Sequence, residues 1–176
     1  MNEILKKNGI TFGTIAGLAS VLITTLIYTI DITLFTKWWV GIISIIISLS
    51  ISIYLMIKTK KDLNGNFPFK SAFTTYFISA VIGVLISVAF NIILFNFVDP
   101  AAKDTIKELT IKFTVEMLEK FNTPKNAINE AIKGMQENDP YSISQLLKGS
   151  VFTILFSSLF GLILAAIFKS KTPEHL

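Results

Sequence analysis

Few side chains in this sequence could act as acids, bases, nucleophiles or metal ligands. The single histidine, His175, is next to the last residue, where a solvated chain end is a better expectation than a ligand. No cysteine occurs, which excludes disulfides, thiolate chemistry and iron–sulfur clusters. No phosphate-binding glycine loop or nucleophile elbow is present either. We therefore expect no catalytic residues, no metal, no cofactor and no enzymatic activity.

Two polar residues lie within or at the end of an apolar stretch. Asn91 is strongly polar and lies well inside an apolar stretch. It either bonds to a neighbouring helix or lines a polar path, and we favour the bond because membrane asparagines commonly make one. Asp31 lies at the end of an apolar stretch, where solvation at the interface is favoured over catalysis. No carboxylate or lysine lies in the middle of such a stretch, although ion-coupled transporters usually need one.

Small residues recur every four positions in the apolar stretches, which places them on one face of a helix. Such faces let helix backbones approach closely in a membrane, so packing within one bundle is the favoured interpretation. Contact between copies and a polar substrate path are the alternatives. A serine stripe, Ser44, Ser48 and Ser52, follows the same spacing. The residues expected to pack helices are Gly9, Gly13, Gly17, Ser79, Gly83, Ser87, Asn91, Ser157 and Gly161.

The elements that position these residues follow from charge and length. Of 176 residues, 52% are hydrophobic and 16% are charged, where a soluble domain has about a quarter charged. Charge-free stretches of about 20 residues or more are long enough to cross a bilayer as helices. Their unalternating apolar composition does not fit the strands of a membrane barrel. The expected spans, about 9–30, 38–57, 71–97 and 145–168, belong to one domain comprising residues 1–176.

Lysine placement predicts the orientation of the spans. The N-terminus, the second loop and the C-terminal tail together have a charge of +5, whereas the opposite side has −1. Because lysine-rich short loops stay in the cytoplasm, we expect both termini to be cytoplasmic. The basic residues are all lysines. Without arginine, the basic balance is poor evidence for nucleic-acid binding, and we expect no nucleic-acid partner.

A polar segment, residues 99–141, separates the third and fourth spans, and its pattern predicts an amphipathic helical hairpin. Asp99-Pro100 and Thr123-Pro124 resemble caps with a proline in the first turn, and Ser142 should cap the last span. The candidate partner face is Ile106, Leu109, Phe113, Met117 and Phe121. This face must be covered by the second helix, by a partner or by the lipid surface. Binding to lipid through charge is disfavoured because the segment is almost neutral.

Two short motifs give the sequence a family resemblance. The stretch Asp62–Ala72, DLNGNFPFKSA, resembles the entry to the third helix in the DUF4199 family of uncharacterised Bacteroidota membrane proteins. Phe95–Pro100, FNFVDP, resembles the exit from that helix in the family. The order of three spans, a helical segment and a fourth span also agrees. In the second loop the sequence departs from the family, with Lys58, Lys60 and Lys61 where arginines are expected. The resemblance implies a bacterial inner-membrane protein and assigns no activity.

Together these features predict an all-α membrane protein. It has four transmembrane helices and an extracytoplasmic amphipathic helical hairpin between the third and the fourth. The expected environment is a bacterial inner membrane, with the lipid bilayer as the main contact and a membrane protein or a second copy as a further partner. The favoured function is a non-enzymatic scaffold or accessory protein. The alternative is a small oligomeric transporter or channel that uses the serine faces and Asn91.

Overall fold

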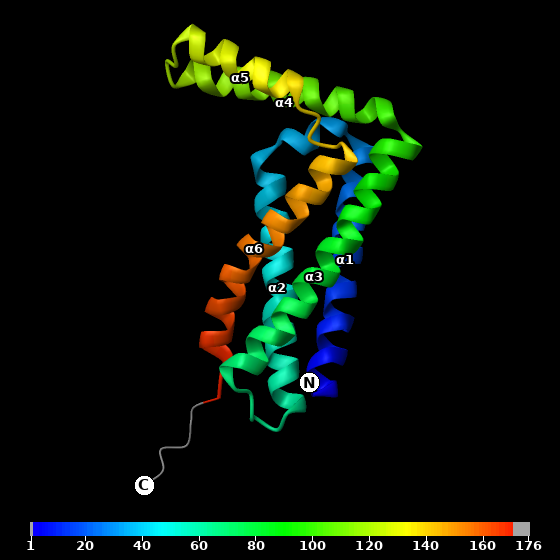
Figure 1. Cartoon of the computed structure of the whole chain (residues 1–176), viewed down its shortest axis with the longest axis vertical. Helices are drawn as coiled ribbons and strands as arrows, with labels where there is room; N and C mark the ends of the chain where they lie inside the picture. The colour runs from blue at the N-terminus through cyan, green and yellow to red at the C-terminus, as the bar shows by residue number, and fades with distance from the viewer. Residues whose placement is uncertain (1, 171–176) are drawn as a thin grey trace.

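A computed structural model describes residues 2–170, and its elements in this range are all helices (Figure 1). The predicted all-helical fold is thus confirmed, while His175 lies outside the described residues. Four of these helices are long and apolar enough to cross a membrane, so the chain is a membrane protein. They are α1 (Glu3–Ile30), α2 (Trp38–Asp62), α3 (Phe69–Ile93) and α6 (Ile143–Phe168).

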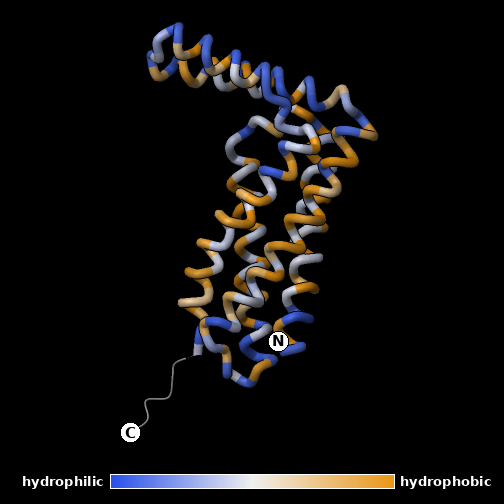
Figure 2. Tube along the Cα trace, in the orientation of Figure 1, coloured by the Kyte–Doolittle hydropathy of each residue, from blue (hydrophilic) through white to orange (hydrophobic). Residues whose placement is uncertain are grey.

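Four shorter elements lie together at one end of the bundle formed by the long helices (Figure 1). They are the 3-10 helix η1 (Ile32–Thr36), the π-helix η2 (Leu94–Val98), α4 (Pro100–Lys120) and α5 (Lys125–Glu137). We call this the capped end. The start of α1, the α2–α3 connection and the end of α6 lie at the other end, which we call the terminal end. Hydrophilic residues gather at both ends and in α4 and α5, whereas the long helices between them are mainly hydrophobic (Figure 2).

Helix α1 packs along α3 so closely that three of its positions have no room for a side chain. A Cβ atom at Gly13 would lie 2.7 Å from the carbonyl oxygen of Ser79 and 2.9 Å from Cβ of Ile82. Gly9 and Gly17 are confined in the same way by side chains of α3. The glycine stripe therefore forms the contact surface between α1 and α3.

Helix α3 packs on its other side against α6, mainly near the terminal end. Gly161 lies directly under the ring of Tyr76, so that a Cβ atom there would overlap the ring. This contact continues into a buried apolar core to which α1, α2 and the α2–α3 connection also contribute. The core consists of Leu5, Met56, Phe67, Ala72, Tyr76, Leu164 and Ala165.

A second apolar core holds the capped end together. Phe95 of η2 is completely buried, with its ring centroid 4.5 Å from that of Tyr141 and 5.9 Å from that of Phe35. Ala102 and Ile106 of α4 belong to the same core. One aromatic side chain thus links η1, the start of α4 and the chain segment that enters α6.

Polar side chains define where the helices at the capped end begin. The carboxylate of Asp99 accepts from the backbone N–H of Ala102, and its second oxygen accepts from the Tyr28 hydroxyl at 2.8 Å. The predicted caps at Asp99 and Ser142 are confirmed. The prediction that Thr123 caps α5 is wrong. The helix begins one residue later, so Pro124 occupies the cap position and has no side chain that could accept a hydrogen bond.

An ion pair joins α4 to the segment between α5 and α6. The ammonium of Lys103 lies 3.0 Å from the carboxylate of Asp139, which also accepts from the backbone N–H of Tyr141. Partial burial of Asp139 raises the pKa of its carboxyl, but Lys103 and the Tyr141 N–H stabilise the charged form more strongly. The pKa of Asp139 is consequently lowered from its ordinary value.

This lowered pKa predicts an acid-sensitive contribution to stability. The unfolded chain binds the proton more readily, so the contribution is complete above the ordinary aspartate pKa of about 3.9 and is lost as the pH falls through the folded pKa. Asp139→Asn should lower the unfolding temperature in detergent at pH 7 and should reduce the further loss on acidification to pH 3. Asp104→Asn, at an exposed position of α4, is the matched control and should behave like the parent. If Asp139→Asn and the parent lose stability equally on acidification, the Asp139 carboxylate is not the source of the acid sensitivity.

Candidate functional site

The candidate site arises because α2 is attached to the other long helices at one end only. Its buried residues are Leu55, Met56 and Thr59, all in its last turns near the terminal end. Earlier in the helix none of its residues is fully buried. Toward the capped end, α2 therefore leaves a space beside α1 and α3.

A small polar cluster stabilises the attached end of α2. The side-chain amide of Asn8 in α1 donates to the hydroxyl of Thr59 at 3.2 Å and to the carboxylate of Asp62 at 2.9 Å. Lys58 forms an ion pair with the same carboxylate at 2.8 Å. Because Asn8 and Thr59 are buried, these bonds satisfy groups that would otherwise be costly in an apolar environment.

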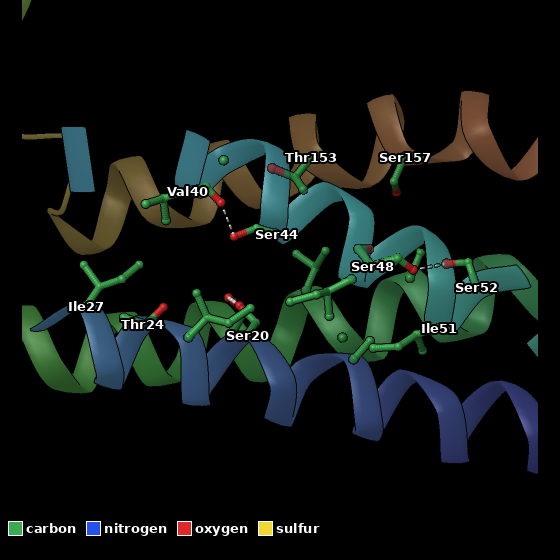
Figure 3. A pocket seen from close by; sticks show the side chains of 18 of the residues that line it. Ser20, Thr24, Ile27, Val40, Ser44, Ser48, Ile51, Ser52, Thr153 and Ser157 are labelled. Carbon is green, nitrogen blue, oxygen red and sulfur yellow. Dashed lines mark hydrogen bonds between the residues drawn. The ribbon is translucent and has the colours of Figure 1, made fainter. Parts of the chain in front are cut away.

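The space left by α2 is a cavity of about 670 Å³ inside the bundle (Figure 3). Helices α1, α2, α3 and α6 form its walls, and residues of η1 and α4 line it at the capped end. Its apolar lining includes Ile23, Ile27, Ile47 and Ile51. The lining residues with a hydroxyl group are Ser20, Thr24, Thr36, Ser44, Ser48, Ser52, Tyr76, Ser79, Ser87, Thr153 and Ser157.

Several of these hydroxyls have already donated their proton within their own helix. Ser44 donates to the carbonyl of Val40 at 2.9 Å, and Ser52 donates to that of Ser48 at 2.9 Å. Ser157 of α6 donates to the carbonyl of Ile154, three residues earlier, at 3.0 Å. Because a hydroxyl oxygen keeps two lone pairs after donating, these side chains offer the cavity acceptors rather than donors.

The cavity has little charge among its described lining residues. Lys37, at the capped end, is the lining residue with a charged side chain, and Tyr76 is the other one with an ionisable group. Within residues 2–170, no three His, Asp or Glu side chains lie close enough together to hold a metal ion. The arrangement can therefore bind by hydrogen bonding and apolar contact, and it offers no carboxylate–base pair for acid–base chemistry.

Several residues expected to pack helices also line this cavity. Ser79, Gly83 and Ser87 face both α1 and the cavity, and the hydroxyls of Ser87 and Ser20 lie 2.9 Å apart across the α1–α3 contact. Ser157 reaches the cavity from α6. Thus the small-residue stripes bring α3 close to α1 and also contribute hydroxyl groups to the cavity lining.

The hydrogen bonding of Asn91 differs from the expected bond to a neighbouring helix. Its amide donates to the carbonyl of Ser87, four residues earlier in the same helix, at 2.8 Å, instead of bonding to a neighbouring helix. It is also not among the lining residues of the cavity. The physical reason is proximity, since in an apolar environment the nearest acceptor is the carbonyl one turn back.

The residues of the candidate partner face of α4 have different surroundings in the structure. Ile106 is buried in the core of the capped end, and Leu109 is half-buried. Phe113 lines the cavity, yet it is 41% exposed. Met117 and Phe121 are exposed as well.

Sequence reasoning missed the α1 side of the cavity. Ala16, Ser20 and Thr24 line it and follow one another at four-residue spacing. This second stripe runs beside the glycine stripe of the same helix. The same periodicity test would have found it, because small and hydroxyl-bearing side chains alternate with large apolar ones there.

Comparisons with known proteins identify the family without assigning an activity. The family model described as "Protein of unknown function (DUF4199)" matches residues 11–170, which is most of the chain. No curated protein and no solved structure matched the sequence. Since the match covers all four long helices apart from the first turns of α1, the chain belongs to the DUF4199 family.

Proposed function

We propose that this protein binds a small uncharged molecule inside the membrane and passes it across, and that it does so without enzymatic chemistry. The observation that supports this proposal is the cavity between α1, α2, α3 and α6, whose lining combines hydroxyl-bearing and apolar side chains. Its volume of about 670 Å³ lies within the range of ligand-binding pockets, about 300–1,000 Å³. The sequence alone favours a scaffold, and the cavity shifts the preference to a transporter or channel.

The lining indicates the chemistry of the bound molecule. Serine oxygens that have donated to their own helix favour a ligand with hydrogen-bond donors, such as a polyol or an amide. Isoleucines on α1 and α2 favour an adjoining apolar part. Lys37 at the capped end disfavours a cation. An uncharged molecule also fits a site within the bilayer, where an unpaired charge is costly.

The proposal includes the orientation of the chain in the membrane. Lysine asymmetry supports cytoplasmic termini, with the capped end and an α4–α5 hairpin on the opposite side of a bacterial inner membrane. The molecule would then enter at the capped end. Helix α2 is the element whose movement would widen the path, because its buried contacts are confined to its other end.

Solute uptake into vesicles that contain the protein tests this function. We expect vesicles containing the purified protein to take up glycerol, erythritol or urea faster than protein-free vesicles, measured by swelling in stopped-flow light scattering. Ser44→Phe should abolish this difference because the ring would occupy the cavity. Ser50→Phe is the matched control, since Ser50 is an exposed serine of the same helix outside the cavity lining, and it should keep the flux.

Two results would count against transport through the cavity. Equal swelling of vesicles with and without the protein for all three solutes would reject transport of this class. A loss of flux in both serine variants would show a general effect of the added ring and not a block of the cavity.

A scaffold or accessory role is the second candidate. It is favoured by the exposed charged residues of α4, among them Asp104, Glu108 and Lys112. A membrane protein that co-purifies in mild detergent, and is lost when these charges are replaced, would support it. This outcome is independent of the flux measurement.

A further inference from the structure

One face of α4 is covered along its first half and uncovered along its second half. Ala102 and Ile106 are 4% and 2% exposed, whereas Met117 and Phe121 are 41% and 77% exposed. Their spacing places all four on one side of the helix. The fold therefore leaves the second half of a continuous apolar surface substantially exposed.

The length of α4 explains why the exposure of this face changes along the helix. Its 21 residues correspond to about 31 Å at about 1.5 Å per residue. The first turns lie on η1 and η2, which end the long helices, and the rest of α4 projects past the bundle together with α5 (Figure 1). The uncovered half belongs to this projecting part.

The direction of this face is given by Phe113. That residue lies between the covered and the uncovered halves, and it lines the cavity inside the bundle. The face thus points toward the bundle and not away from it. Met117 and Phe121, which follow on the same side, point in the same direction beyond the edge of the bundle.

Helix α5 does not occupy this position. Its contact with α4 lies on another side, where the ammonium of Lys107 donates to the carbonyl of Gln136 at 2.6 Å. Ile128 is the buried residue of α5, and Leu118 of α4 is half-buried. The side of α4 away from the bundle has exposed Asp104 and Glu108. The Lys107 contact with α5 and the exposed acidic residues therefore lie on sides of α4 other than the one with Met117 and Phe121.

We propose that Met117 and Phe121 are immersed in the lipid leaflet at the capped end, so that the projecting part of α4 lies on the membrane surface. The apolar outer surface of the four long helices faces lipid, and the projecting part of α4 runs across the end of these helices (Figure 1), so that its uncovered half continues that surface where they end. A helix with a charged side toward water and Phe or Leu toward acyl chains is typical of an interfacial position. Since the segment is almost neutral, apolar burial and not attraction to anionic headgroups holds it there.

Spin labels test the proposal directly, because the chain has no cysteine that would need to be removed. Met117→Cys and Phe121→Cys, each labelled with a nitroxide and reconstituted in phosphatidylcholine vesicles, should be more accessible to oxygen than to a water-soluble nickel complex. Lys112→Cys, on an exposed part of the same helix, is the matched control and should show the reverse. Adding phosphatidylglycerol should leave both patterns unchanged.

Three results would overturn the proposal. Labels at both apolar positions that are as accessible to nickel as the label at position 112 would place the face in water. Labels shielded from both reagents, with shielding lost on dilution of the protein in lipid, would assign the face to a second copy. Oxygen accessibility that appears only with anionic lipid would mean that charge and not apolar burial holds the helix. None of these outcomes depends on whether the cavity transports a solute.

Discussion

Replacing Gly13 by alanine is expected to force α1 away from α3 and to lower the free energy of unfolding by about 1–3 kcal/mol, the usual cost of overpacking. The added Cβ atom would lie 2.7 Å from the carbonyl oxygen of Ser79 and 2.9 Å from Cβ of Ile82. A backbone carbonyl in a long helix cannot rotate aside as the end of a side chain can. The contact is therefore relieved only by displacing one helix relative to the other.

The same substitution at Gly149 is the matched control. A Cβ atom at Gly149 in α6 meets nothing within 4 Å, so alanine costs no packing there. Alanine also has a helix propensity about 1 kcal/mol better than that of glycine. Gly149→Ala should thus leave the free energy of unfolding unchanged or raise it, measured by titration with SDS in mixed micelles. A Gly13→Ala protein as stable as Gly149→Ala would contradict the close packing of α1 on α3.

The sequence was sufficient to predict the number and the apolar, membrane-spanning type of the long helices. A charged residue in the hydrocarbon region is costly, so stretches without charge mark the helices that cross it. The four stretches found in this way correspond to α1, α2, α3 and α6, and the family resemblance is confirmed by the match over residues 11–170. The spacing of Gly9, Gly13 and Gly17 was also enough to define one face of α1, which in the structure lies against α3.

The cavity could not be predicted in the same way. A four-residue stripe identifies a helix face but not the element that this face meets. The glycines of α1 meet α3, whereas Ser44, Ser48 and Ser52 of α2 face open space. This difference depends on where α2 is attached, and its attachment through Asn8 and Thr59 joins residues 51 positions apart.

The π-helix η2 and the bonding of Asn91 were missed for a related reason. Asn96 in η2 donates to the carbonyl of Tyr141, which is 45 positions away in the sequence. A local pattern contains no signal for that contact. Asn91 was expected to reach another helix, but a closer acceptor in its own helix satisfies its amide.

Replacing Phe95 by alanine should have the largest effect at the capped end. The side chain is fully buried between Phe35 and Tyr141, and removing a buried phenyl ring typically costs about 3–5 kcal/mol, including the cavity that is left. Because the ring also contacts the core that contains Ala102 and Ile106, the loss should extend to the start of α4. We expect lower stability in SDS titration and faster amide hydrogen exchange in α4, with little change in the first half of α3.

Phe97 provides the control from the same π-helix. It lies two residues after Phe95, but it is 71% exposed, so its ring faces the surroundings of the bundle and not the core. In a membrane, lipid chains fill the space left by an exposed ring, and Phe97→Ala should create no cavity. Its free energy of unfolding and the exchange rates in α4 should therefore stay close to those of the parent. If both alanine variants destabilise the protein equally, burial of Phe95 is not what holds the capped end. If only Phe95→Ala releases α4, the aromatic core around this residue is what fixes α4 across the end of the bundle.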